Sequence, residues 1–173
     1  QAGASAVISV ASVGGIRADL CPGSLVVPDQ IIDYTWGRKS TFHENSDEPV
    51  VHIDFTEPYD EGVRRRILAA AVTAGQPIVD GAVYAATQGP RLETAAEINR
   101  LERDGADLVG MTGMPEAALA RELGIPYAAI NVVANFAAGR ASSEHEICFD
   151  SIDAVLREAM GRVRNVLDHL CEA

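Results

Sequence analysis

Three short apolar runs lie in the second half of the chain, and two segments with helix signals separate them. The runs cover residues 82–87, 107–111 and 127–134. Apolar runs of this length, rich in strand-forming residues and bounded by turn residues, predict buried strands. Strands that alternate with helices are typical of α/β proteins, so the sequence predicts an α/β fold.

The two segments between these runs carry the start and stop signals of helices. Thr94 is expected to be a helix N-cap, and Glu97 three residues later completes a capping box. This helix is expected to end near Gly105. Pro115 suits the first turn of the second helix, which is expected to end near Gly124. Polar residues therefore follow each apolar run, and ligands of α/β proteins bind at such strand ends.

Two more strands are expected in the first half of the chain. Residues 4–11 predict a strand, and Gly14-Gly15 predicts a turn after it. The apolar stretch 25–34 predicts a single strand that is bulged or at a sheet edge, because Pro28 interrupts it.

Apolar residues at helical spacing predict two long helices, at 59–75 and from Ser151 onward. The run Arg64-Arg-Arg66 lies within the first of them. In an acidic protein, three arginines on a helix are expected to form a solvated or interface face rather than a nucleic-acid patch.

The composition is that of one globular domain with a strongly negative net charge. Its 173 residues, 47% hydrophobic and 23% charged, suit a single domain over residues 1–173. The net charge of −11 argues against nonspecific binding to nucleic acid or to anionic membrane surfaces, and no nucleic-acid or membrane partner is expected. No apolar run reaches the roughly 18 residues that a membrane helix needs. Three widely spaced cysteines with no Cys-x-x-Cys pair argue against a zinc site and fit the reducing cytoplasm, where we expect the protein to act.

Several motifs occur in the same order as in one enzyme family. From Ala4 to about Gly139 the sequence resembles the trimeric purine nucleoside phosphorylase and methylthioadenosine phosphorylase superfamily. The matching motifs are Pro22-Gly23, Asp29-Gln30 with Asp33, His52 with Glu57-Pro-Tyr59, Gln88-Gly-Pro-Arg-Leu-Glu-Thr94, Asp107-Leu-Val-Gly-Met-Thr112, and Pro115-Glu116 with Leu119-Ala120. The resemblance implies a mixed, partly closed β-sheet flanked by helices, and a homotrimer. It also implies reversible cleavage of a purine nucleoside by inorganic phosphate as co-substrate, without a metal or an organic cofactor.

The resemblance assigns the base-binding and sugar-binding roles to residues of these motifs. Glu93 and Asn135 would hold the base and act on the departing purine. Leu92 would also bind substrate, Met111 would pack against the sugar, and Thr112 would hydrogen-bond phosphate or sugar. The protein's contribution would be positioning and electrostatic stabilisation of the leaving group.

The phosphate side and the 5' side of the substrate depend on other parts of the chain. Ser12 would lie in a loop that offers backbone N–H groups to phosphate, and His52 would reach the 5' side of the sugar in the neighbouring subunit's site. Family members also carry an N-terminal portion with a Gly-rich phosphate loop and an Arg-His segment. Neither occurs in this sequence. The domain is therefore expected to be nucleoside phosphorylase-like but without the N-terminal phosphate-loop portion.

The pair Glu93 and Asn135 favours a 6-oxopurine. A carboxylate only accepts hydrogen bonds and suits N1–H, whereas an amide N–H₂ can donate to N7 or O6. The expected reaction converts S-methyl-5'-thioinosine to hypoxanthine and 5-methylthioribose 1-phosphate. Two alternatives remain open: an enzyme for inosine and guanosine or for methylthioadenosine, and a catalytically silent purine-binding fragment.

Overall fold

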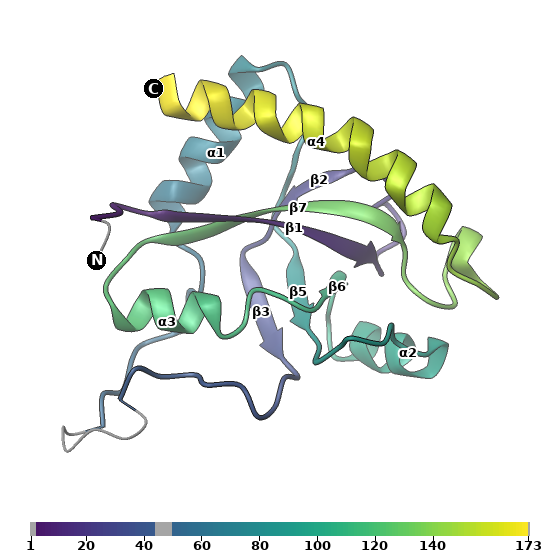
Figure 1. Cartoon of the computed structure of the whole chain (residues 1–173), viewed down its shortest axis with the longest axis horizontal. Helices are drawn as coiled ribbons and strands as arrows, with labels where there is room; N and C mark the ends of the chain where they lie inside the picture. Colours follow the sequence, from purple (N-terminus) through teal and green to yellow (C-terminus); the bar gives the residue numbers. More distant parts are fainter. Residues whose placement is uncertain (1–2, 44–49, 173) are drawn as a thin grey trace.

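Seven strands form one mixed sheet with helices on both faces (Figure 1). The computed structural model describes residues 3–43 and 50–172. The strand order is β3-β5-β6-β1-β7-β2-β4. The strands are β1 (Val7–Gly15), β2 (Leu25–Val27), β3 (Gln30–Asp33), β4 (Val79–Asp80), β5 (Val83–Ala86), β6 (Leu108–Gly110) and β7 (Tyr127–Phe136). The helices are α1 (Glu61–Thr73), α2 (Ala95–Arg103), α3 (Glu116–Glu122) and α4 (Phe149–Glu172), with a 3-10 turn η1 (Ala141–Ser143). The α/β prediction is confirmed.

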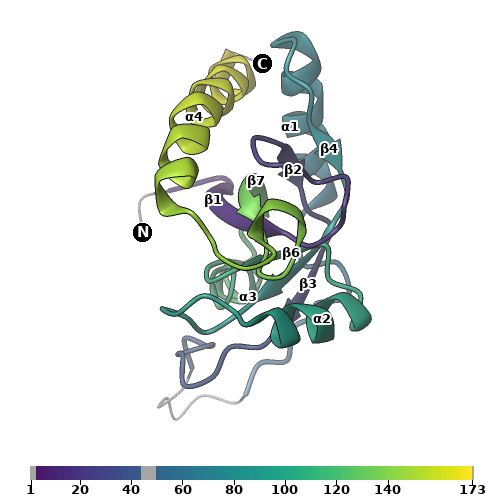
Figure 2. The ribbon, with the colours of Figure 1, turned by 90° about the vertical axis from the view of Figure 1, so that its right-hand side faces the viewer.

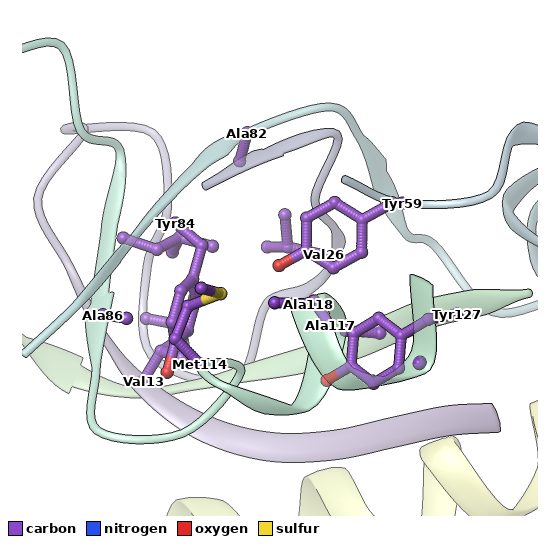
Figure 3. Close-up of a cluster of buried hydrophobic side chains, with 14 of the residues drawn as sticks. Val13, Val26, Tyr59, Ala82, Tyr84, Ala86, Met114, Ala117, Ala118 and Tyr127 are labelled. Atoms are coloured by element: carbon purple, nitrogen blue, oxygen red, sulfur yellow. The ribbon is translucent and has the colours of Figure 1, made fainter. Parts of the chain in front are cut away.

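Helices cover both faces of the central strand β7. Helices α1 and α4 lie on one side of β1 and β7, and α2 and α3 lie on the other (Figure 2). Along β7, Ala128, Ile130 and Val132 join the apolar cluster that includes α1 and α4. The alternate residues Tyr127 and Ala129 join a second cluster, in which the Tyr127 ring stacks on Tyr59 at a centroid distance of 5.9 Å (Figure 3). Because both faces are buried, this strand is mostly apolar, with the buried Asn131 as an exception near its middle.

The glycine pair at 14–15 does not form the predicted turn. Both residues belong to β1 and pair with Val109 and Leu108 of β6. A Cβ on Gly15 would lie 2.4 Å from the carbonyl oxygen of Leu20, so a backbone close by requires glycine here. The strand continues through the glycines, and the predicted end of β1 was wrong.

The stretch 25–34 forms two strands rather than one. Strand β2 pairs with β7 and β4, whereas β3 lies at the edge of the sheet beside β5. Pro28 and Asp29 separate them, and the Asp29 carboxylate accepts a hydrogen bond from the backbone N–H of Ala82 (2.8 Å). The edge-strand prediction is confirmed for β3 and wrong for β2, because Pro28 ends one strand and the chain changes its partner.

One of the three arginines on α1 is buried, so the prediction of a solvated or interface face was wrong for Arg64. Arg64 is 7% exposed, and its Nε donates to the carbonyl of Pro28 (3.0 Å). Its guanidinium also forms ion pairs with Glu61 and Asp80, which joins α1 to the β2 and β4 side of the sheet. The neighbouring Arg65 has a largely exposed side chain (77%).

Replacing Arg64 by methionine is expected to lower the free energy of unfolding by about 1–3 kcal/mol. The change removes a charged donor from the Pro28 carbonyl, but the half-exposed Glu61 and Asp80 carboxylates can regain water. Urea unfolding measures the loss. Arg65→Met is the matched control and is expected to stay within about 0.5 kcal/mol of the parent. Equal losses in the two variants would contradict the assignment of Arg64 as a structural link.

Candidate functional site

A cavity of about 390 Å³ lies along β1 and the ends of β6 and β7. Its volume is in the range of small-molecule sites. Six of the seven predicted site residues line it: Ser12, Leu92, Glu93, Met111, Thr112 and Asn135. The topology explains this convergence, because β1 is paired with β7 along its length and meets β6 at its end. Residues that are far apart in the sequence are therefore brought to one place.

Glu93 lies in the loop after β5, and a neighbouring hydroxyl orients its carboxylate. The Thr87 hydroxyl donates to Glu93 Oε1 (2.6 Å), and the Thr87 backbone N–H donates to the carbonyl of Gly110 (2.8 Å). A carboxylate has about four lone-pair positions, so this contact leaves acceptor capacity for a ligand. Sequence reasoning missed Thr87, because a threonine at the end of a strand carries no distinctive signal.

The start of α2 fixes the position of Leu92 and Glu93. The Thr94 hydroxyl accepts the N–H of Glu97 (3.1 Å), and the Glu97 carboxylate accepts the N–H of Thr94 (2.8 Å). The predicted capping box is confirmed. Arg91 pairs with Glu97 (2.7 Å), and the two bonds from Arg91 and from the Thr94 N–H lower the pKa of Glu97 to about 2. Glu97 is therefore ionised near neutral pH and holds the loop that carries Glu93.

Asn135 is the penultimate residue of β7. The strand does not end at Asn135, as the sequence suggested, but continues to Phe136. A register shift after Val13 places Asn135 opposite Gly14. The Asn135 amide Nδ2 donates to the carbonyl of Phe136 (2.6 Å). An amide has two N–H groups and an acceptor oxygen, so a second donor remains for a ligand.

Met111 and Thr112 follow β6 and are held by glycine and tyrosine neighbours. The Thr112 N–H donates to the hydroxyl of Tyr84 (3.1 Å). Burial raises the pKa of Tyr84, so this hydroxyl keeps its proton. A Cβ on Gly89 would lie 2.4 Å from Met111 Sδ, and Gly89 has a φ of +64° that suits glycine. Gly89 thus leaves space for the Met111 side chain.

The structure places Ser12 at the cavity but corrects its local environment. Ser12 lies within β1, opposite Val132 of β7, and not in a loop. A strand has its N–H groups directed along the sheet, so the predicted loop of phosphate-binding N–H groups does not form here. His52 is exposed and is not among the residues that line this cavity. Its predicted place in another subunit's site stays a prediction.

Three apolar residues in the first turn of α4 or just before it also line the cavity. The sequence analysis did not identify them as site residues. They are Ile147, Phe149 and Ile152. The only signal was the helical spacing of Ile152 with later apolar residues. The tertiary contact that brings the start of α4 to β1 could not be predicted from that spacing.

The described residues contain no cluster of metal ligands and no helix that could cross a membrane. Within residues 3–43 and 50–172, no cluster of three or more His, Cys, Asp or Glu side chains could hold a metal ion. In the same residues, none of the helices combines the length and the apolar character that crossing a bilayer would require.

Comparison with known proteins finds relatives that are named as nucleoside phosphorylases. The chain is 50% identical over 173 residues to the probable S-methyl-5'-thioinosine phosphorylase of Pseudomonas syringae pv. tomato. The alignment covers all of this chain and 70% of the relative. It is 43% identical over 144 residues to the 6-oxopurine nucleoside phosphorylase of Pyrococcus furiosus, with 80% of this chain and 54% of the relative covered. The methylthioadenosine phosphorylase of Schistosoma mansoni in complex with adenine superposes with a TM-score of 0.90 at 30% identity, over 97% of this chain and 64% of that one.

These relatives are longer than this chain, which spans between 54% and 70% of their length. The family match, in contrast, extends over residues 1–172. On this match and on the sequence identity to its relatives, the chain belongs to the Phosphorylase superfamily.

Proposed function

We propose that the chain binds a 6-oxopurine nucleoside in the β1–β7 cavity and cleaves it with inorganic phosphate. The favoured substrate is S-methyl-5'-thioinosine, and the products are hypoxanthine and 5-methylthioribose 1-phosphate. The observation that carries this proposal is that the Glu93 carboxylate and the Asn135 amide line one cavity. An acceptor and a donor in one cavity match N1–H and the O6/N7 edge of hypoxanthine.

The reaction replaces one bond to the sugar by another. The bond from C1' to the purine nitrogen N9 breaks, a phosphate oxygen bonds to C1', and negative charge develops on the departing purine. The Asn135 amide would donate to N7 or O6 as this charge grows, and Glu93 would hold N1–H. Met111 would pack on the sugar, while Thr112 and Ser12 line the same cavity and their hydroxyls would donate to phosphate or sugar. These roles need no metal or organic cofactor.

The relatives support the choice of base and of 5' substituent. The Pseudomonas syringae relative is named for methylthioinosine and the Pyrococcus furiosus relative for 6-oxopurine nucleosides. Inosine and guanosine are therefore the second candidate substrates. The apolar residues Ile147, Phe149 and Ile152 favour the first candidate, because a methylthio group gains from an apolar wall and a hydroxyl does not.

Replacing Ile152 by threonine is expected to lower the preference for methylthioinosine over inosine by about tenfold, since one apolar group in such a pocket is worth about 10- to 200-fold. The ratio of kcat/KM values for the two nucleosides measures the effect. Val155→Thr makes the same kind of change one turn later on α4, outside this cavity. A ratio that falls equally in both variants would argue against a 5' site at the start of α4.

A homotrimer is part of this proposal, and exposed apolar side chains near His52 and at the end of α3 support self-association of the chain. Trp36, Phe42 and Val50 are each more than half exposed, as is Leu123 at the end of α3. The backbone N–H of Phe42 donates to Glu122 (2.7 Å), so this segment is held against α3. Contact with a second copy would bury these side chains and bring His52 toward that copy's cavity. Light scattering of the purified chain tests the mass of the assembly.

A cytoplasmic location accords with the cysteines. Cys21, Cys148 and Cys171 are all free and exposed. Exposed free thiols persist in a reducing compartment.

The deciding experiment measures turnover of methylthioinosine, inosine and methylthioadenosine with and without phosphate, together with calorimetric binding of hypoxanthine. Phosphate-dependent release of hypoxanthine, fastest from methylthioinosine, is the expected result. Hypoxanthine binding without turnover would instead favour a silent purine-binding chain. Absence of both binding and turnover would remove the functional proposal.

A further inference from the structure

One arginine joins the two loops that carry four of the six predicted site residues at the cavity: Leu92, Glu93, Met111 and Thr112. Arg38 lies in the segment between β3 and α1 and is half-buried. Its Nη2 donates to the carbonyls of Thr87 (3.2 Å) and Gln88 (3.1 Å) in the loop after β5. Its Nη1 donates to the carbonyl of Met114 in the loop after β6. A single planar group therefore contacts the backbone of both loops.

The chemistry of the guanidinium suits this position. It carries five N–H donors in a fixed plane and no acceptor. Hydrogen bonds from a charged donor are stronger than those between neutral groups, and partial burial strengthens them further. A lysine ammonium is a single nitrogen and cannot span the three carbonyls in the same way.

Each of the two loops leads from Arg38 to a residue of the cavity. On the first loop, Arg38 fixes the carbonyl of Thr87, and the Thr87 hydroxyl donates to the Glu93 carboxylate. On the second loop, Met114 follows Met111 and Thr112, which line the cavity. Arg38 itself is not among the residues that line the cavity.

We propose that Arg38 is a positioning residue for the base site. It holds the loop of Glu93 and the loop of Met111 and Thr112 at a fixed separation, and it acts on the substrate through Thr87 and Glu93. The kinetic part of this proposal rests on the proposed function. The structural part does not, because the separation of the loops can be measured without any ligand.

The ligand-free test is amide hydrogen exchange in Arg38→Met, which keeps the length of the side chain and removes all its donors. The reporters are the N–H groups of Thr87 and Thr112, which donate to Gly110 of β6 and to the hydroxyl of Tyr84 of β5 and so tie each loop to the neighbouring strand. We expect both to exchange about tenfold faster or more, while the amides of Ile130 and Val132 in β7 keep their rates. Unchanged rates at Thr87 and Thr112 would overturn the proposal, and so would equal acceleration in β7, which would indicate general destabilisation.

The functional test compares Arg38→Met, Arg38→Lys and the exposed control Arg65→Met. A displaced catalytic constellation loses about 10- to 100-fold in efficiency. In Arg38→Met we therefore expect hypoxanthine affinity to fall about tenfold and the KM for nucleoside to rise. Arg38→Lys should be intermediate and Arg65→Met unchanged. Equal hypoxanthine affinities in all variants would overturn the positioning role. If the parent chain binds no hypoxanthine, the proposed function fails and the exchange rates alone decide whether Arg38 joins the loops.

Discussion

Replacing Glu93 by glutamine is expected to lower kcat/KM for methylthioinosine by about 10²- to 10³-fold, the usual loss when one preorganised polar contact to a leaving group is removed. The reason lies in the contact with Thr87. The Thr87 hydroxyl donates to Glu93 Oε1 at 2.6 Å, so the oxygen of a glutamine would take that place. The amide N–H₂ would then face the purine N1–H. Two donors would oppose each other in a partly buried site, whereas the native carboxylate offers an acceptor.

The measurement is the initial rate of hypoxanthine release at several nucleoside concentrations. Glu158→Gln, an exposed glutamate on α4 outside the cavity, makes the same chemical change and should leave the rate unchanged. Thr87→Val tests the cause, because it removes the hydroxyl but keeps the shape of the side chain. It is expected to give a smaller loss of the same kind. A Glu93→Gln enzyme within about threefold of the parent would show that another group holds N1–H.

The parts of the fold that could be predicted are those that local chemistry decides. Thr94 and Glu97 formed the capping box because both partners lie within one helical turn. The apolar runs became β5, β6 and β7 because their residues suit buried strands. Six of the predicted site residues line one cavity, since they lie on or after strands that share one sheet.

The parts that could not be predicted depend on contacts between distant segments. Gly15 is in a strand because it pairs with Leu108 of β6 and Phe136 of β7, and these partners are distant in the sequence. Arg64 is buried because Pro28 and Asp80 accept its donors from elsewhere in the chain. Arg38 and Ile152 carried no motif, and only the folded arrangement brings the first to two loops and the second to the cavity. Tertiary packing decided each of these cases.

Replacing Asn135 by aspartate is expected to shift the preference from 6-oxopurine toward 6-aminopurine nucleosides. The Asn135 amide donates to the carbonyl of Phe136 at 2.6 Å, and its other N–H is available to the purine. A carboxylate has no donor for O6 or N7 of hypoxanthine and would accept from the 6-amino group of adenine. The aspartate carboxylate would also place one acceptor next to another, the carbonyl of Phe136. The side chain is therefore expected to rotate toward the ligand.

The expected change in the kcat/KM ratio of methylthioinosine to methylthioadenosine is about 10- to 100-fold, because one unpaired buried polar group costs about 1–3 kcal/mol. Two further variants separate this cause from simple damage to the site. Asn135→Ala removes donor and acceptor together, so the rate should fall while the order of preference stays. Asn99→Asp makes the same chemical change on the exposed surface of α2 and should alter neither rate nor preference. If Asn135→Asp keeps the parent ratio, the amide does not read the 6-position, and base choice must lie with Glu93 and its hydrogen bond from Thr87.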